Sequence, residues 1–264
     1  MRVAMPGGYA LNAVVEGPQE APWLVLSNSL AADLSMWDEQ AAWLARHYRL
    51  LRYDTRGHGG SDAPPGPYTI DALAGDVLAL LDHVGAARAS FMGLSLGGMT
   101  GLALAARHPD RIARLVCCAA RADAPPAYAA GWEPRIASVA TQGMAAVLSG
   151  TLDRWLSPAT QAAMPGLRAR LADAILRTDP AGYAGCARAI QGLDLLPDLG
   201  RIVCPTLLVA GGADAGIPLD AMHAVAAAIP GARLAVVADA AHIVNLDQTP
   251  AFDRVVADFL VPGA

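Results

Sequence analysis

The chain has 264 residues, of which 54% are hydrophobic and 16% are charged, which excludes a disordered or solvated chain and is sufficient for a large buried core. Its formal net charge is −5, and its 19 basic side chains form no cluster that could follow a phosphate backbone. Nucleic acid is therefore not an expected partner.

Neither an export signal nor a membrane span is expected. Residues 1–17 lack a charged segment followed by an apolar one, and no apolar run approaches the roughly 18 residues of a membrane span. Adjacent Cys117 and Cys118 are unsuited to a disulfide framework, and the chain has no Cys-x-x-Cys metal spacing. We expect a soluble cytoplasmic protein whose cysteines are small buried hydrophobes, with no membrane partner.

Apolar runs alternate with helical patterns through the first 120 residues. Strands are expected at 23–27, 48–53, 89–93 and 112–119, and helices at 36–47, 70–84 and 96–107. This alternation is typical of an α/β protein in which helices cover both faces of a parallel sheet.

The alternation stops after residue 120 and resumes near residue 205. Strands are then expected at 205–210 and 233–238, and helices at 219–229 and 252–260. Between these parts, residues 121–195 show helical patterns, several prolines and no convincing strand. We predict one core domain from residues 1–120 and 196–264, with residues 121–195 inserted as a helical cap over the carboxyl edge of the sheet, where sites form in open parallel sheets.

The strongest chemical signal is the sequence Gly-Leu-Ser-Leu-Gly-Gly at residues 93–98. It lies where an apolar strand ends and a helix begins, which is the context of a nucleophile elbow. Glycine at both ends lets neighbouring backbone approach the strained turn, so Ser95 is the candidate nucleophile.

A serine nucleophile needs a base, and the base needs an acid to orient it. His242 follows the last expected strand, at the same sheet edge as Ser95, whereas the other histidines lie in or beside helices or in a glycine-rich loop. Asp214 directly follows the strand at 205–210 and is the expected acid. Asp239 is too near His242 in sequence, and Asp123 is the alternative.

Acyl transfer also needs donors for the oxyanion. We expect the backbone N–H groups of Leu96, at the helix start, and Leu30, after the first central strand. The glycine-rich loop at 54–61 lacks a phosphate-binding pattern, and Arg56 is expected to bond backbone carbonyls in a structural turn.

With these motifs the chain resembles the 3-oxoadipate enol-lactonase family of the α/β-hydrolase superfamily. The superfamily resemblance rests on residues 54–61 and 93–98 with Asp214 and His242. The narrower resemblance rests on the segments 26–30, 33–37, 51–58, 66–70, 178–179, 182–184 and 241–243. Two departures are Leu96, where the family commonly has methionine, and the segment 117–126, which affects the shape of the pocket.

The resemblance implies an α/β-hydrolase fold: a mostly parallel, twisted sheet flanked by helices, with an inserted helical cap. It also implies a serine hydrolase that opens a carboxylated enol-lactone through an acyl-enzyme, without metal or organic cofactor. Trp132 and Arg135 match the family's Trp-x-x-Arg segment, which makes Trp132 a pocket wall and Arg135 a candidate carboxylate clamp. Trp155 and Met144 are further candidates for the pocket lining.

Two alternatives stay open at this point, because a fold does not determine a function. One is a carboxylesterase or cofactor-free perhydrolase that accepts neutral esters. The other is a ligand-binding receptor with negligible turnover. An intact triad favours an enzyme, and an arginine facing the pocket favours an acidic lactone as substrate.

Overall fold

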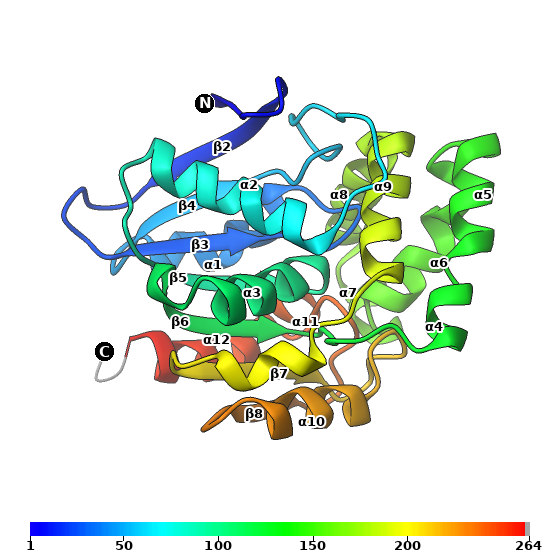
Figure 1. Cartoon of the computed structure of the whole chain (residues 1–264). Coiled ribbons are helices and arrows are strands. Elements are labelled where there is room, and N and C mark those ends of the chain that lie inside the picture. Colours follow the sequence, from blue (N-terminus) through cyan, green and yellow to red (C-terminus); the bar gives the residue numbers. More distant parts are fainter. Residues whose placement is uncertain (262–264) are drawn as a thin grey trace.

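The computed structural model describes residues 1–261, and they form one eight-stranded sheet in the order β1-β2-β4-β3-β5-β6-β7-β8 (Figure 1). β1 and β2 pair antiparallel, as do β2 and β4, and all other neighbours are parallel. The strands are β1 (Arg2–Ala4), β2 (Ala10–Glu16), β3 (Trp23–Ser27), β4 (Arg49–Tyr53), β5 (Ala89–Leu94), β6 (Ile112–Cys118), β7 (Thr206–Gly211) and β8 (Arg233–Val237). The predicted α/β fold with a mostly parallel sheet is confirmed.

Helices cover both faces of the sheet, as the alternation of strands and helices predicts. α2 (Ile70–His83), α3 (Leu96–Arg107) and α10 (Leu219–Ala228) cover the face toward the viewer in Figure 1. α1 (Asp38–Leu44) and α12 (Thr249–Leu260) lie behind the sheet, and the Gln40 side chain of α1 donates a hydrogen bond to Asp253 of α12 at 2.9 Å.

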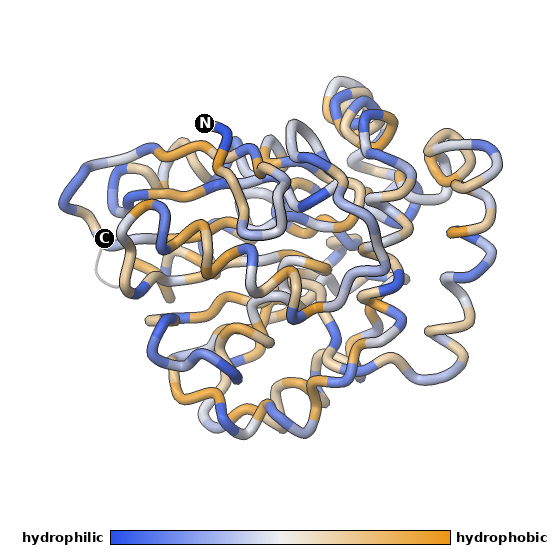
Figure 2. Tube along the Cα trace, turned by 45° about the horizontal axis from the view of Figure 1, so that its top comes forward, coloured by the Kyte–Doolittle hydropathy of each residue, from blue (hydrophilic) through white to orange (hydrophobic). Residues whose placement is uncertain are grey.

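The central strands are apolar because both of their faces are covered. Every residue of β5 and β7 is buried, and the apolar segments in Figure 2 follow the strands, while hydrophilic segments gather at turns. β1 and β2 were not expected from the sequence. They lie at the antiparallel edge of the sheet, where β2 is only partly buried and its apolar pattern is weak.

Six α-helices follow β6 and precede β7, and they gather at one end of the sheet (Figure 1). They are α4 (Pro126–Ala130), α5 (Glu133–Gln142), α6 (Ala145–Trp155), α7 (Pro158–Ala163), α8 (Pro165–Arg177) and α9 (Pro180–Gln191). A Cβ atom at Gly182 of α9 would lie 2.4 Å from the Cα of Gly57, so two glycines let this helix touch the loop after β4. We propose that these helices form the cap, with the boundaries predicted above.

The loop after β4 differs from the prediction in one contact. Arg56 bonds one backbone carbonyl, that of Ala72, but its main partner is the buried carboxylate of Asp76, at 2.7 Å. The guanidinium also lies over the rings of Tyr9 and Tyr68. An ion pair was not expected, because Asp76 lies in a helix 20 residues further along the chain.

All four cysteines are free and buried, and burial raises the pKa of the Cys117 thiol to about 12, so this side chain is not a reactive thiolate. Within residues 1–261 no helix is long and apolar enough to cross a membrane.

Candidate active site

Ser95 occupies a strained turn between β5 and α3. Its φ of 57° and ψ of −113° lie outside the backbone regions that residues other than glycine normally adopt. A Cβ atom at Gly93 would lie 2.2 Å from the carbonyl oxygen of Gly97, and one at Gly97 would lie 2.3 Å from that of Ser27. The two glycines are therefore a steric requirement of the turn, as the nucleophile-elbow motif predicts.

The structure brings His242 and Asp214 into direct contact. The Nδ1–H of His242 donates to Oδ2 of Asp214 at 2.8 Å, and the other carboxylate oxygen accepts from the backbone N–H groups of Gly216 and Ile217. The Asp214 side chain is 1% exposed. This arrangement holds the imidazole in the tautomer whose Nε2 can accept a proton.

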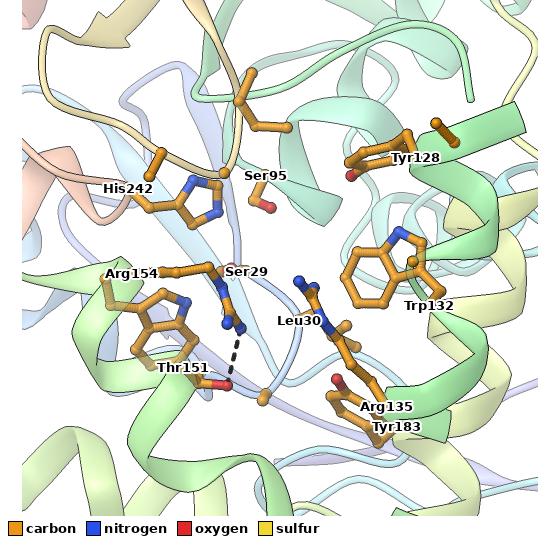
Figure 3. A pocket seen from close by; sticks show the side chains of 17 residues that line it. Ser29, Leu30, Ser95, Tyr128, Trp132, Arg135, Thr151, Arg154, Tyr183 and His242 are labelled. Atoms are coloured by element: carbon orange, nitrogen blue, oxygen red, sulfur yellow. Dashed lines mark hydrogen bonds between the residues drawn. The ribbon is translucent and has the colours of Figure 1, made fainter. Parts of the chain in front are cut away.

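Ser95 and His242 line the same cavity, and Figure 3 shows the imidazole beside the serine side chain. The structure has no hydrogen bond between these two side chains. Without substrate such contacts are often long, and they tighten when substrate binds. The shared cavity and the orientation of the imidazole agree with the predicted role of His242 as the base for Ser95.

The two predicted oxyanion donors differ from their neighbours in having no acceptor among residues 1–261. The N–H groups on either side of Leu30 are occupied, since Ser29 donates to the Met36 sulfur and Ala31 donates to His58. The N–H groups on either side of Leu96 are occupied as well, by backbone carbonyls. Within the described part of the chain, the N–H groups of Leu30 and Leu96 have no acceptor.

His58 supports the loop that carries Leu30, a contact that the sequence does not reveal. Its Nε2 accepts the Ala31 N–H at 2.9 Å, and its Nδ1–H donates to the Arg56 carbonyl at 3.0 Å. Ala31 has a φ of 68°, a conformation that costs free energy in a residue other than glycine. Neutral His58 therefore stabilises the backbone next to the Leu30 amide.

This contact predicts a pH dependence of stability. Burial lowers the pKa of His58, and the Arg56 carbonyl and nearby carboxylates only partly oppose this effect. The unfolded state takes up the proton first, so the contribution is complete above a pH of about 6.5 and is lost as the pH falls through the folded-state pKa. Urea unfolding at several pH values should show this loss, with a slope of at most about 1.4 kcal/mol per pH unit.

The variant His58→Gln should lower the stability at neutral pH and flatten its dependence on pH below 6.5. His223→Gln on the exposed surface of α10 is the control, and it should retain the wild-type slope. Equal slopes for His58→Gln and the wild type would show that His58 does not titrate in this way.

A cavity of about 290 Å³ lies between the strand ends and the cap helices (Figure 3). Ser95, His242 and the predicted residues Leu30, Trp132, Arg135 and Trp155 line it. Met144 is buried in the cap but is not among the lining residues. Other lining side chains were not predicted from the sequence, namely Tyr128, Thr151, Arg154, Tyr183 and Ile217.

Two arginines face this cavity. The Arg135 guanidinium lies 4.8 Å from the centre of the Trp132 ring, and Arg154 donates to the Thr151 hydroxyl at 3.2 Å. Neither arginine has an acidic partner within residues 1–261. Burial and the positive charge of Arg135 both lower the pKa of Arg154. The cavity thus holds two arginines that form no salt bridge among the described residues, a site suited to an anion.

The alternative acid, Asp123, does not contact His242. Its carboxylate pairs with Arg121 at 2.9 Å, and its backbone bridges to Asp194. Among the residues that the structure places, no group of three or more His, Cys, Asp or Glu side chains could hold a metal ion.

Residues 22–249 match the family model described as the alpha/beta hydrolase fold. The chain belongs to this family. This hydrolase is 36% identical to 3-oxoadipate enol-lactonase 2 of Acinetobacter baylyi, over 94% of the chain and 91% of the relative. It also matches the crystal structure of the enol-lactonase from Burkholderia xenovorans LB400 with 44% identity and a TM-score of 0.94, over 98% of this chain and 99% of that chain.

A further relative has another name. The putative carbamate hydrolase RutD of Pseudomonas savastanoi pv. phaseolicola is 33% identical, over 91% of the chain and 94% of the relative. The predicted resemblance to enol-lactonases is confirmed, and the chain is a hydrolytic enzyme rather than a receptor without turnover.

Proposed function

We propose that this hydrolase opens 3-oxoadipate enol-lactone to 3-oxoadipate, a step in the degradation of aromatic compounds. The substrate is a small five-membered lactone that carries a carboxymethyl group. The observation that carries the proposal is the pair Arg135 and Arg154, two arginines without acidic partners in the cavity of Ser95 and His242. A carboxylate on the substrate supplies the missing negative charge, whereas a neutral ester does not.

Acylation begins when the Ser95 oxygen attacks the lactone carbonyl and His242 Nε2 takes the serine proton. Asp214 stabilises the resulting imidazolium through its bond to Nδ1. The negative oxygen of the tetrahedral intermediate accepts hydrogen bonds from the N–H groups of Leu30 and Leu96. When the intermediate collapses, the ring C–O bond breaks, and the ring oxygen leaves with the electron pair as an enolate.

The imidazolium of His242 gives its proton to the enolate oxygen, and the product part of the acyl-enzyme becomes an enol. A water molecule then attacks the acyl carbon and transfers its proton to His242, which returns a proton to the Ser95 oxygen as the ester bond breaks. The enol tautomerises to the 3-oxo group. The balance requires one water molecule and no cofactor.

The substrate proposal is tested by Arg135→Ala, assayed on the enol-lactone and on a neutral p-nitrophenyl ester. A charge-assisted hydrogen bond is worth roughly 1.5–3 kcal/mol, so kcat/KM for the acidic lactone should fall by about 10- to 150-fold. The neutral ester has no carboxylate for Arg135 to bind, so its kcat/KM should be almost unchanged. Lysine at this position should restore only part of the activity, because a point charge lacks the guanidinium fork.

Arg154→Ala should show the same selectivity for the acidic substrate. The matched control is Arg168→Ala, which removes an arginine of α8 that bonds Gln161 outside the cavity. If both cavity variants lower kcat/KM equally for the two substrates, or lower it for neither, the arginines do not recognise the carboxylate. A neutral ester, which a carboxylesterase or a perhydrolase accepts, then becomes the better proposal.

A further inference from the structure

Asp247 is buried, 6% exposed, and joins two parts of the molecule that are distant in sequence. It ends α11 (Val244–Asp247), the short helix that follows His242. One carboxylate oxygen accepts the backbone N–H and the hydroxyl of Ser157, both at 2.9 Å. The other accepts the N–H of Ala241 at 2.7 Å, directly before His242. The side chain therefore connects the start of α7 to the loop of the histidine.

The end of α6 meets the same loop. The N–H of His242 donates to the Arg154 carbonyl at 3.2 Å, and the N–H of Ile243 donates to that of Trp155 at 3.0 Å. The last carbonyls of a helix have no partner within the helix, so the histidine loop satisfies these two. The last turn of α6 thus contacts the cavity through its side chains and the histidine through its backbone.

A carboxylate suits this position because all three groups that face it are donors. An amide has only one oxygen, so an asparagine would direct its NH₂ group toward an N–H group of either Ser157 or Ala241. Within the described residues Asp247 has no cationic partner. Its contacts are with backbone and hydroxyl donors, which set position rather than charge.

We infer that Asp247 is a positioning residue for His242: together with the carbonyls that end α6, it fixes the histidine loop to the cap helices. The inference rests on the proposed role of His242 as the base, and it does not depend on which ester or lactone is the substrate. It implies that the helices around residues 154–157 determine how the imidazole meets Ser95.

The test is Asp247→Asn, which keeps the shape of the side chain and removes one acceptor. The rate of labelling by a fluorophosphonate and kcat on a neutral p-nitrophenyl ester should both fall by about 10- to 100-fold, the range expected for a displacement near 1 Å. KM should change less than kcat. Asp247→Glu keeps two acceptor oxygens and should recover part of the rate. Labelling within twofold of the wild type in a folded Asp247→Asn would overturn the inference.

The control is Asp198→Asn, a carboxylate that pairs with Arg107 at the far end of α3 from Ser95. It should lower the melting temperature without slowing the labelling. If Asp247→Asn does not fold, the double variant Ser157→Ala with Thr160→Val is used instead. It removes the bond from the Ser157 hydroxyl to the Asp247 carboxylate and the bond from the Thr160 hydroxyl to the Asp247 backbone carbonyl, and it keeps the carboxylate. This double variant loses only part of the contacts of Asp247, so the histidine loop should be displaced less than in Asp247→Asn. Labelling should therefore be about 3- to 10-fold slower than in the wild type. An unchanged rate would overturn the inference.

His242→Ala separates this inference from the proposed function. If His242→Ala labels as fast as the wild type, the proposed base is wrong and Asp247 has no base to position. If His242→Ala abolishes labelling while Asp247→Asn leaves it unchanged, only the positioning role fails. If the enzyme does not open the enol-lactone, the labelling experiment still tests Asp247.

Discussion

Ser95→Ala should fold like the wild type and lose on the order of 10⁴-fold or more in kcat, since removing the nucleophile of a triad has an effect of this size. The hydroxyl makes no hydrogen bond within the described structure, so its loss should leave the melting temperature nearly unchanged. The measurement is kcat on the lactone and on a p-nitrophenyl ester, with thermal unfolding of the same sample.

A serine-directed fluorophosphonate adds an independent test of the nucleophile. It should label Ser95 alone in the wild type, because among residues 1–261 only this hydroxyl lies beside a base oriented by a carboxylate. Mass spectrometry of the labelled peptide identifies the site. Substantial turnover by Ser95→Ala, with contamination excluded, would refute a serine mechanism.

Asp214→Asn should reduce kcat by a factor on the order of 10⁴. A change of this kind in a Ser-His-Asp triad keeps the geometry but stabilises the wrong tautomer of the histidine. Asp214 accepts the Nδ1–H of His242 and two backbone N–H groups. An amide NH₂ in place of the oxygen facing the imidazole would favour the tautomer with its proton on Nε2. That nitrogen could then no longer accept the proton of Ser95.

Asp123→Asn is the matched control, because Asp123 follows the neighbouring strand β6 but pairs with Arg121. We expect its kcat to stay close to that of the wild type. If Asp123→Asn loses activity and Asp214→Asn does not, the assignment of the orienting acid is reversed.

Much of the fold was predictable because the central sheet depends on local patterns. The runs around β3, β5 and β7 are mostly apolar, as is typical of strands buried on both faces, and each is followed by turn residues and a helical period. β1 and β2 were not predictable in the same way. Their stability depends on antiparallel pairing at the sheet edge, and their weak alternation of apolar and polar residues does not predict this pairing.

The candidate triad was predictable for a similar reason. The elbow around Ser95 is encoded within six residues, and the carboxyl ends of parallel strands bring Asp214 and His242 to one edge. The structure places these last two side chains in contact, although their catalytic roles stay predictions. The ion pair of Arg56 with Asp76 was not predictable, since it joins a loop to a helix through packing rather than through adjacent sequence.

The sequence by itself determined the chain order of the six parallel strands, β3 to β8, the strained serine turn and the membership of a hydrolase family, because each depends on residues a few positions apart or on a pattern along the whole chain. Only the tertiary structure decided that Arg154 joins Arg135 in the cavity and that His58 and Asp247 hold the loops of Leu30 and His242. The contacts of Asp247 with Ser157 span 90 residues. Such contacts exist only after the helices have packed against the sheet, and the direction of each side chain depends on that packing.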